Sequence, residues 1–93
     1  MRKCLRIKVT GNVQGVAYRS FVQKQAQVLG VEGTVQNAED GCVVVYACGK
    51  SDQLDKLIDL LYKGSTSSSV TDVHIEPLLQ DRDFRGVFRI IGT

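Results

Sequence analysis

The chain has 93 residues, of which 43% are hydrophobic, and it carries a formal net charge of +2 at pH 7. A chain of this length can bury roughly 60 to 65% of its unfolded surface, so we expect a single domain over residues 1–93. No apolar run approaches the ~20 residues that cross a bilayer, and the first residues lack a signal-peptide pattern. The weak, scattered charge argues against nucleic acid or a membrane as partner. We expect a soluble cytoplasmic monomer.

The three cysteines, Cys4, Cys42 and Cys48, form an odd number and lack the C-x-x-C spacing of a zinc site. If Cys42 and Cys48 share a strand, about 3.3 Å per residue holds them roughly 20 Å apart, which is too far for a bond. We therefore expect no disulfide framework and no metal site, and interpret the cysteines as small hydrophobic residues. A reducing compartment is consistent with this interpretation.

Hydrophobic periodicity predicts an alternation of strands and helices. Leu5, Ile7 and Val9 alternate with polar residues, as in a half-buried strand, and this strand ends at Gly11. The predicted helices instead repeat apolar residues at three- and four-residue steps, and a glycine follows each of them. In chain order we expect a strand over 5–10, a helix over 19–29, strands over 31–37 and 42–48, a helix over 51–63 with Ser51 as its N-cap, and strands over 73–76 and 84–91.

This order of elements, with one short extra strand at its end, is the split βαβ arrangement. The predicted fold class is α+β: a ferredoxin-like β-α-β-β-α-β sandwich in which an antiparallel sheet carries two helices on one face. Because such crossovers are right-handed, the second strand returns to the end of the sheet from which the first helix departs. Arg19 and Asn37 should therefore meet at one end of the sheet.

The loop GNVQGVAYR, residues 11–19, joins the first strand to the first helix. Gly11 and Gly15 allow backbone conformations that expose several N–H groups, and the positive end of a helix follows directly. Such a loop can surround an anion, and Arg19 adds a charged fork that fits two phosphate oxygens. The same glycines could also simply end a strand and open a turn. The loop is thus a candidate grip for the phosphate of a small molecule.

Two strings make this candidate more specific. They are G-x-V-Q-G-V-x-[FY]-R at residues 11–19 and A-x-x-L-G-[LV]-x-G-x-V-x-N-x-x-D-G at residues 26–41. Both resemble the acylphosphatase family, and the resemblance covers nearly the whole chain, although it weakens beyond Gly64. It implies an enzyme without metal or cofactor that hydrolyses a small-molecule acyl phosphate to a carboxylate and inorganic phosphate.

The resemblance also implies roles for individual residues. Arg19 matches the arginine that binds the phosphate, and Asn37 matches the asparagine that orients the attacking water. An amide is no general base, but its carbonyl oxygen can accept a hydrogen bond from water and aim that water at phosphorus. The implied phosphate-binding set consists of Val13, Gln14, Gly15, Val16, Ala17, Tyr18 and Arg19.

Some positions depart from the family pattern. Asn12 stands where many members carry a basic residue, and Ala17 stands where glycine or cysteine is common. Thr34 replaces a frequent aromatic residue, and Ser65 replaces a proline, which bears on the rim of the site and on the rigidity of a loop. The changes at Asn12 and Ala17 remove no catalytic group. In the last strand, over residues 84–91, the aromatic pattern aligns only with an ambiguous one-residue offset.

Other functions remain open on the sequence. Asn37 could serve only as a turn-starting residue, and the loop could then hold a phosphorylated ligand in a non-catalytic ferredoxin-like module. An RNA-binding domain of this architecture would carry a K/R-G-F/Y-type string on its central strand, whereas residues 42–48 read CVVVYAC. A third alternative is kinship with the acylphosphatase-like domains of larger carbamoyl-transferring enzymes. We expect a free-standing hydrolase.

Overall fold

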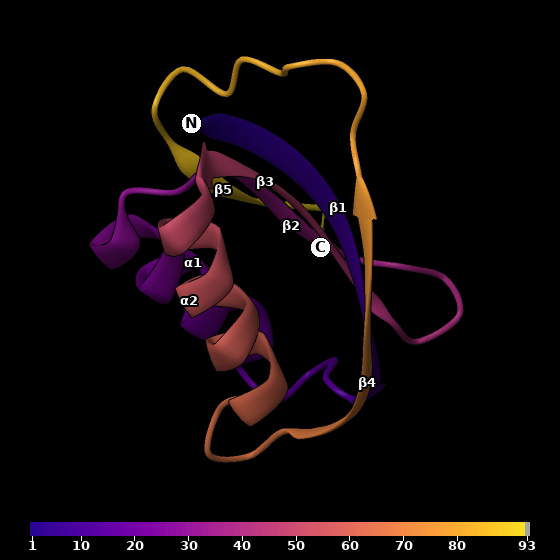
Figure 1. Cartoon of the computed structure of the whole chain (residues 1–93). Helices are drawn as coiled ribbons and strands as arrows, with labels where there is room; N and C mark the ends of the chain where they lie inside the picture. The colour runs from indigo at the N-terminus through magenta and orange to yellow at the C-terminus, as the bar shows by residue number, and fades with distance from the viewer. Residues whose placement is uncertain (93) are drawn as a thin grey trace.

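The computed structural model describes residues 1–92 and contains two helices packed on one face of a five-stranded sheet (Figure 1). The strands lie in the order β4-β1-β3-β2-β5. No helix of these residues is long and apolar enough to cross a membrane. The elements are β1 (Arg2–Asn12), α1 (Tyr18–Leu29), β2 (Glu32–Asn37), β3 (Val43–Lys50), α2 (Ser51–Lys63), β4 (Ser69–Pro77) and β5 (Phe88–Ile91). The predicted α+β, ferredoxin-like class is confirmed.

The sheet is mixed, which corrects the prediction that it is wholly antiparallel. The strands β4, β1, β3 and β2 pair antiparallel, but β5 pairs parallel with β2. The chain leaves β4 at one edge, passes over the end of the sheet through residues 78–87, and enters β5 at the other edge (Figure 1). Since β2 starts at that same end, β5 must run in the same direction as β2.

The last strand is shorter than predicted, because residues 84–87 form a turn in place of its first half. Arg85 and Gly86 both have left-handed backbones, with φ of 58° and 72°. The carboxylate of Asp83 accepts a hydrogen bond from the backbone N–H of Arg85 at 2.8 Å and stabilises the turn. The aromatic and β-branched composition that predicted a strand here is therefore overridden by a local side-chain hydrogen bond.

The helices begin close to their predicted positions. The first helix, α1, starts at Tyr18, one residue earlier than expected. The second, α2, starts at Ser51, so the N-cap is Lys50 and the prediction of Ser51 as cap is wrong. The side chain of Gln53 reaches back and its Oε1 accepts the N–H of Lys50 at 3.0 Å, which satisfies the donor that precedes the helix.

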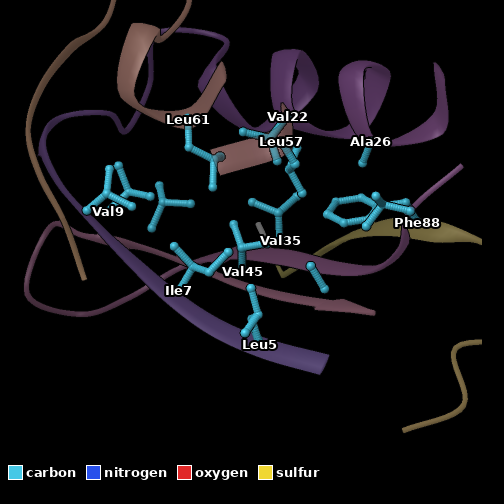
Figure 2. Close-up of a cluster of buried hydrophobic side chains, with 14 of the residues drawn as sticks. Leu5, Ile7, Val9, Val22, Ala26, Val35, Val45, Leu57, Leu61 and Phe88 are labelled. Atoms are coloured by element: carbon cyan, nitrogen blue, oxygen red, sulfur yellow. The ribbon is translucent and has the colours of Figure 1, made fainter. Parts of the chain in front are cut away.

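One hydrophobic core fills the space between the sheet and the helices (Figure 2). Ile7, Val45 and Val35 lie side by side in register on three neighbouring strands and are fully buried. Leu57 of α2 and Val22 of α1 close the core from above. Because side chains alternate along a strand, the residue two positions after Val35 faces the same helix-covered side at the end of β2. That residue is the asparagine predicted to orient water.

Cys4 and Cys48 form a disulfide, contrary to the sequence-based prediction. They face each other across β1 and β3, with Cα atoms 4.1 Å apart, whereas Cys42 is buried and free. Spacing along the chain excludes only a bond between Cys42 and Cys48, whereas the pairing of β1 with β3 brings Cys4 and Cys48 together. The bond also removes the support that the cysteines lent to a reducing compartment.

Candidate functional site

The cradle loop, residues 13–17, joins β1 to α1 through two left-handed residues. Gly15 has φ of 70°, and Ala17, the N-cap of α1, has φ of 59°. An alanine in this conformation costs on the order of 1 kcal/mol, which explains why a glycine would suit the position. Within residues 1–92, the backbone N–H groups of the loop donate no hydrogen bond to the protein. They remain available to a ligand.

A cavity of about 120 Å³ opens between the cradle loop and the first turn of α1. This volume is roughly four times the share of one water molecule in the liquid, which suits a small anion. The first turn of α1 contains no acidic residue, so the positive end of the helix is not neutralised. The cavity is lined by Val13, Gly15, Ala17, Tyr18, Arg19, Ser20 and Ile90.

Arg19 lies half-buried at the wall of this cavity. Its Nη1 donates to the backbone oxygen of Ile91 at 3.2 Å, and Ile91 pairs in register with Gln36, the neighbour of Asn37. Arg19 and Asn37 therefore lie at the same end of the sheet, as predicted, because β1 and β2 run in the same direction. A guanidinium has five N–H donors, so the contact with Ile91 orients the group and leaves donors for a ligand.

Asn37 ends β2, on the face that the helices cover. Its Oδ1 is buried and lacks a hydrogen-bond partner, and no other side-chain nitrogen or oxygen of residues 1–92 is in this situation. A buried acceptor without a partner costs about 1 to 3 kcal/mol, so such atoms are rare in folded proteins. The position therefore requires a donor from outside the chain, such as water or a ligand.

The side chain of Gln14 fastens the cradle loop to the turn that follows Asn37. Its Nε2 donates to the backbone oxygens of Ala38 and Cys42, both at 2.8 Å. Gln14 was predicted as a member of the phosphate-binding set, and this contact of its side chain was not predicted. The available signal was a long amide side chain between Val13 and a glycine, in a loop that otherwise contains mainly apolar residues.

Other members of the predicted phosphate set contribute differently. The ring of Tyr18 is buried, its hydroxyl donates to the backbone oxygen of Leu61 at 2.9 Å, and burial raises its pKa well above the ordinary value. The side chain of Val13 is also in the core, so these residues offer the site only their backbone. Sequence reasoning missed Ile90 in the cavity wall and the carbonyl of Ile91, because the alignment of the last strand was ambiguous.

The carboxylate of Asp40, in the turn between β2 and β3, is stabilised in its ionised form. The carboxylate of Asp40 forms an ion pair with Lys8 at 2.7 Å and accepts a hydrogen bond from the backbone N–H of Cys42 at 3.1 Å. The hydrogen bond from Lys8 has the largest effect and that from the Cys42 N–H the next largest, and they lower the pKa of Asp40 to about 2. A carboxylate with this pKa is a weak base near neutral pH, which makes Asp40 unsuitable for accepting a proton from water.

Comparisons with known proteins place the chain in a family. The family model named acylphosphatase matches residues 5–90. Curated acylphosphatases of Chromohalobacter salexigens and Shewanella amazonensis are 42% and 44% identical, over 80% and 81% of this chain and 82% and 81% of their own lengths. The crystal structure of acylphosphatase from Bacillus subtilis has a TM-score of 0.92 at 34% identity, covering 99% of this chain and 100% of that chain. The chain therefore belongs to the acylphosphatase family.

Proposed function

We propose that this enzyme hydrolyses acyl phosphates, with the cradle loop and Arg19 binding the phosphoryl group and Asn37 orienting the attacking water. The observation that carries the proposal is the buried, unpartnered Oδ1 of Asn37, at the same end of the sheet as a small cavity flanked by a guanidinium. Family membership supports the class of reaction. The assignment of roles to individual residues rests on the geometry.

Binding of the phosphoryl group uses fixed donors. Gly15, Ala17 and Arg19 line the cavity, and within residues 1–92 the backbone N–H groups of the cradle loop donate no hydrogen bond to the protein. The transition state of phosphoryl transfer spreads negative charge over the equatorial oxygens, and a carboxylate is a good leaving group. Donors that need not reorganise as this charge shifts are the main catalytic contribution that such a reaction requires.

The Oδ1 of Asn37 orients the water that attacks the phosphorus. A water that donates one hydrogen to Oδ1 has its oxygen lone pair directed toward the phosphorus. The new bond joins the water oxygen to phosphorus, and the bond from phosphorus to the acyl oxygen breaks, with its electron pair leaving on the carboxylate. A phosphoryl oxygen of the substrate takes the proton, because the cradle loop contains no histidine and the carboxylate of Asp40 is paired with Lys8.

The test is the release of phosphate from acetyl phosphate at neutral pH, with and without a metal chelator. In water enriched in ¹⁸O, the label should appear in the phosphate, since the attack is at phosphorus. Release that does not exceed the enzyme-free rate would favour the alternative of a non-catalytic module that binds a phosphorylated ligand. Complete loss of activity with the chelator, or label found in the acetate, would contradict the mechanism.

A further inference from the structure

A second groove, of about 320 Å³, adjoins the phosphate cavity. The two spaces share Ala17 and Ser20, so they lie side by side along the first turn of α1. The groove is formed by the start of α1 and by the loop between α2 and β4. Its lining consists of Val16, Ala17, Ser20, Phe21, Lys24 and residues 65–67.

The lining is apolar next to the cavity and positively charged at its far side. Val16 and Phe21 are half-buried and pack against the hydrophobic core. Lys24 lies four residues after Ser20, one helical turn or about 5.4 Å further along the same face. In the part of the chain that the structure describes, no acidic residue lines the groove and Lys24 forms no ion pair.

The opposite wall of the groove is attached to the cradle loop. The hydroxyl of Ser65 donates to the backbone oxygen of Val16 at 3.4 Å, and the hydroxyl of Ser68 donates to the oxygen of Ser65 at 3.0 Å. These contacts hold the loop after α2 beside the site. A molecule whose phosphate occupies the cavity can therefore place its remaining atoms between this loop and the first turns of α1.

We propose that this groove, the acyl subsite, binds the acyl part of the substrate and favours acyl groups with an apolar body and a carboxylate at the far end. Val16 and Phe21 contact the apolar body, and Lys24 attracts the distal carboxylate. The inference rests on the proposed function and extends it, because the phosphate cavity alone does not distinguish one acyl phosphate from another. Lys24 is thus a residue that determines specificity and takes no part in the bond-breaking step.

The experiment compares two rigid substrates that differ only at the far end, 4-carboxybenzoyl phosphate and 4-methylbenzoyl phosphate, with acetyl phosphate as a reference that does not reach Lys24. In Lys24→Ala we expect kcat/KM for the carboxylated substrate to fall roughly two- to fivefold, mainly through KM, the range for a solvent-exposed ion pair. Lys24→Glu should enlarge the loss. In 1 M salt, where the Debye length is about 3 Å, the effect should nearly vanish.

The matched control is Lys56→Ala, which removes the same charge from an exposed position of α2 outside both the cavity and the groove. It should leave the ratio between the substrates unchanged. A loss in Lys24→Ala that is equal for all substrates, no loss at all, or an equal change in Lys56→Ala would overturn the acyl subsite. Failure of the wild-type enzyme to turn over acetyl phosphate would contradict the proposed function itself, so the two failures are distinguishable.

Discussion

The two ends of the sheet use their polar groups in opposite ways. At the end where β1 begins, which we call the stapled end, the disulfide between Cys4 and Cys48 joins neighbouring strands. There Arg2 bridges the carboxylate of the buried Glu32 and that of Asp81, to which its Nε donates at 2.9 Å. At the cradle end, where β1 finishes, the loop N–H groups and the Oδ1 of Asn37 have no partner within the described chain.

The polar groups of the stapled end contribute to stability, whereas those of the cradle end are free to contact a ligand. At the stapled end, charged groups neutralise one another: hydrogen bonds from Arg2 to Asp81 and then to Glu32 raise the pKa of the arginine. Arg82 adds a cation–π contact, with its guanidinium 4.9 Å from the ring centre of Tyr46. At the cradle end, polar groups left without partners lower stability but remain available to a ligand. Changes at the two ends should therefore have different consequences.

The largest effect is expected on turnover at the cradle end. Asn37→Ala should lower kcat for acetyl phosphate on the order of 100- to 1000-fold while phosphate affinity persists, because only the water loses its acceptor. Arg19→Gln should lower both kcat and phosphate affinity. Steady-state kinetics and inhibition by inorganic phosphate measure the two quantities.

The control for Asn37 is Gln36→Ala, since the side chain of Gln36 faces the opposite side of the sheet. It should leave kcat nearly unchanged. In Asn37→Ala the free energy of unfolding should stay nearly equal, because Oδ1 accepts no hydrogen bond from residues 1–92. Equal behaviour of the Arg19 and Asn37 variants would contradict the division of roles between them.

The next effect is on stability at the stapled end. The double variant Cys4→Ala/Cys48→Ala should lower the free energy of unfolding by about 2 to 4 kcal/mol, because the bond closes a long loop between positions that are 44 apart in the sequence. Turnover of acetyl phosphate should persist under conditions in which the variant is folded. Urea unfolding gives the energy, and Cys42→Ala, which removes the free thiol, is the control. Loss of turnover in the folded double variant would show that the stapled end also affects activity, which would contradict the comparison.

A smaller effect is expected at Tyr18, beneath the cradle. Tyr18→Phe removes the hydrogen bond to Leu61 and should lower the free energy of unfolding by about 1 kcal/mol near neutral pH. Because burial raises the pKa of Tyr18 in the folded state, the contribution is complete below pH 10, the ordinary pKa, and is lost as the pH rises further. The deficit of the variant should therefore shrink in alkaline urea titrations.

The exposed Tyr62, whose hydroxyl donates to Val73 at 3.3 Å, provides the comparison for Tyr18. Tyr62→Phe should cost less and show little of the alkaline trend, since an exposed hydroxyl can exchange its partner for water. If the alkaline loss of stability were the same in Tyr18→Phe as in the wild type, burial of Tyr18 could not be its cause.

The smallest effect concerns the turn beside the site. The pKa of Asp40 is about 2 in the folded state, below its ordinary 3.8, so its ionised form stabilises the fold above pH 3.8 and this contribution is lost as the pH falls toward 2. Asp40→Asn should therefore lower the urea midpoint slightly at pH 6, and the difference from the wild type should close near pH 2.

The sequence by itself determined the order of the elements and the left-handed turn of the cradle loop. The alternation of Leu5, Ile7 and Val9 predicted a strand, and helical periodicity predicted α1 almost to the residue, because local backbone preference and burial agree there. Gly15 indicated a left-handed turn, and its φ is 70°. The β-α-β connection, which makes β1 and β2 run in the same direction, was enough to bring Arg19 and Asn37 to one end of the sheet.

Tertiary structure decided what depends on contacts between distant residues. Strand register paired Cys4 with Cys48, and the path of the chain over the end of the sheet made β5 parallel to β2. Neither follows from periodicity, which reports the face that a residue occupies but not its neighbour across the sheet. In the same way, packing placed Lys24 in a groove beside the cavity at the start of α1 and left the Oδ1 of Asn37 buried without a partner within residues 1–92. Such relations exist only once distant segments meet.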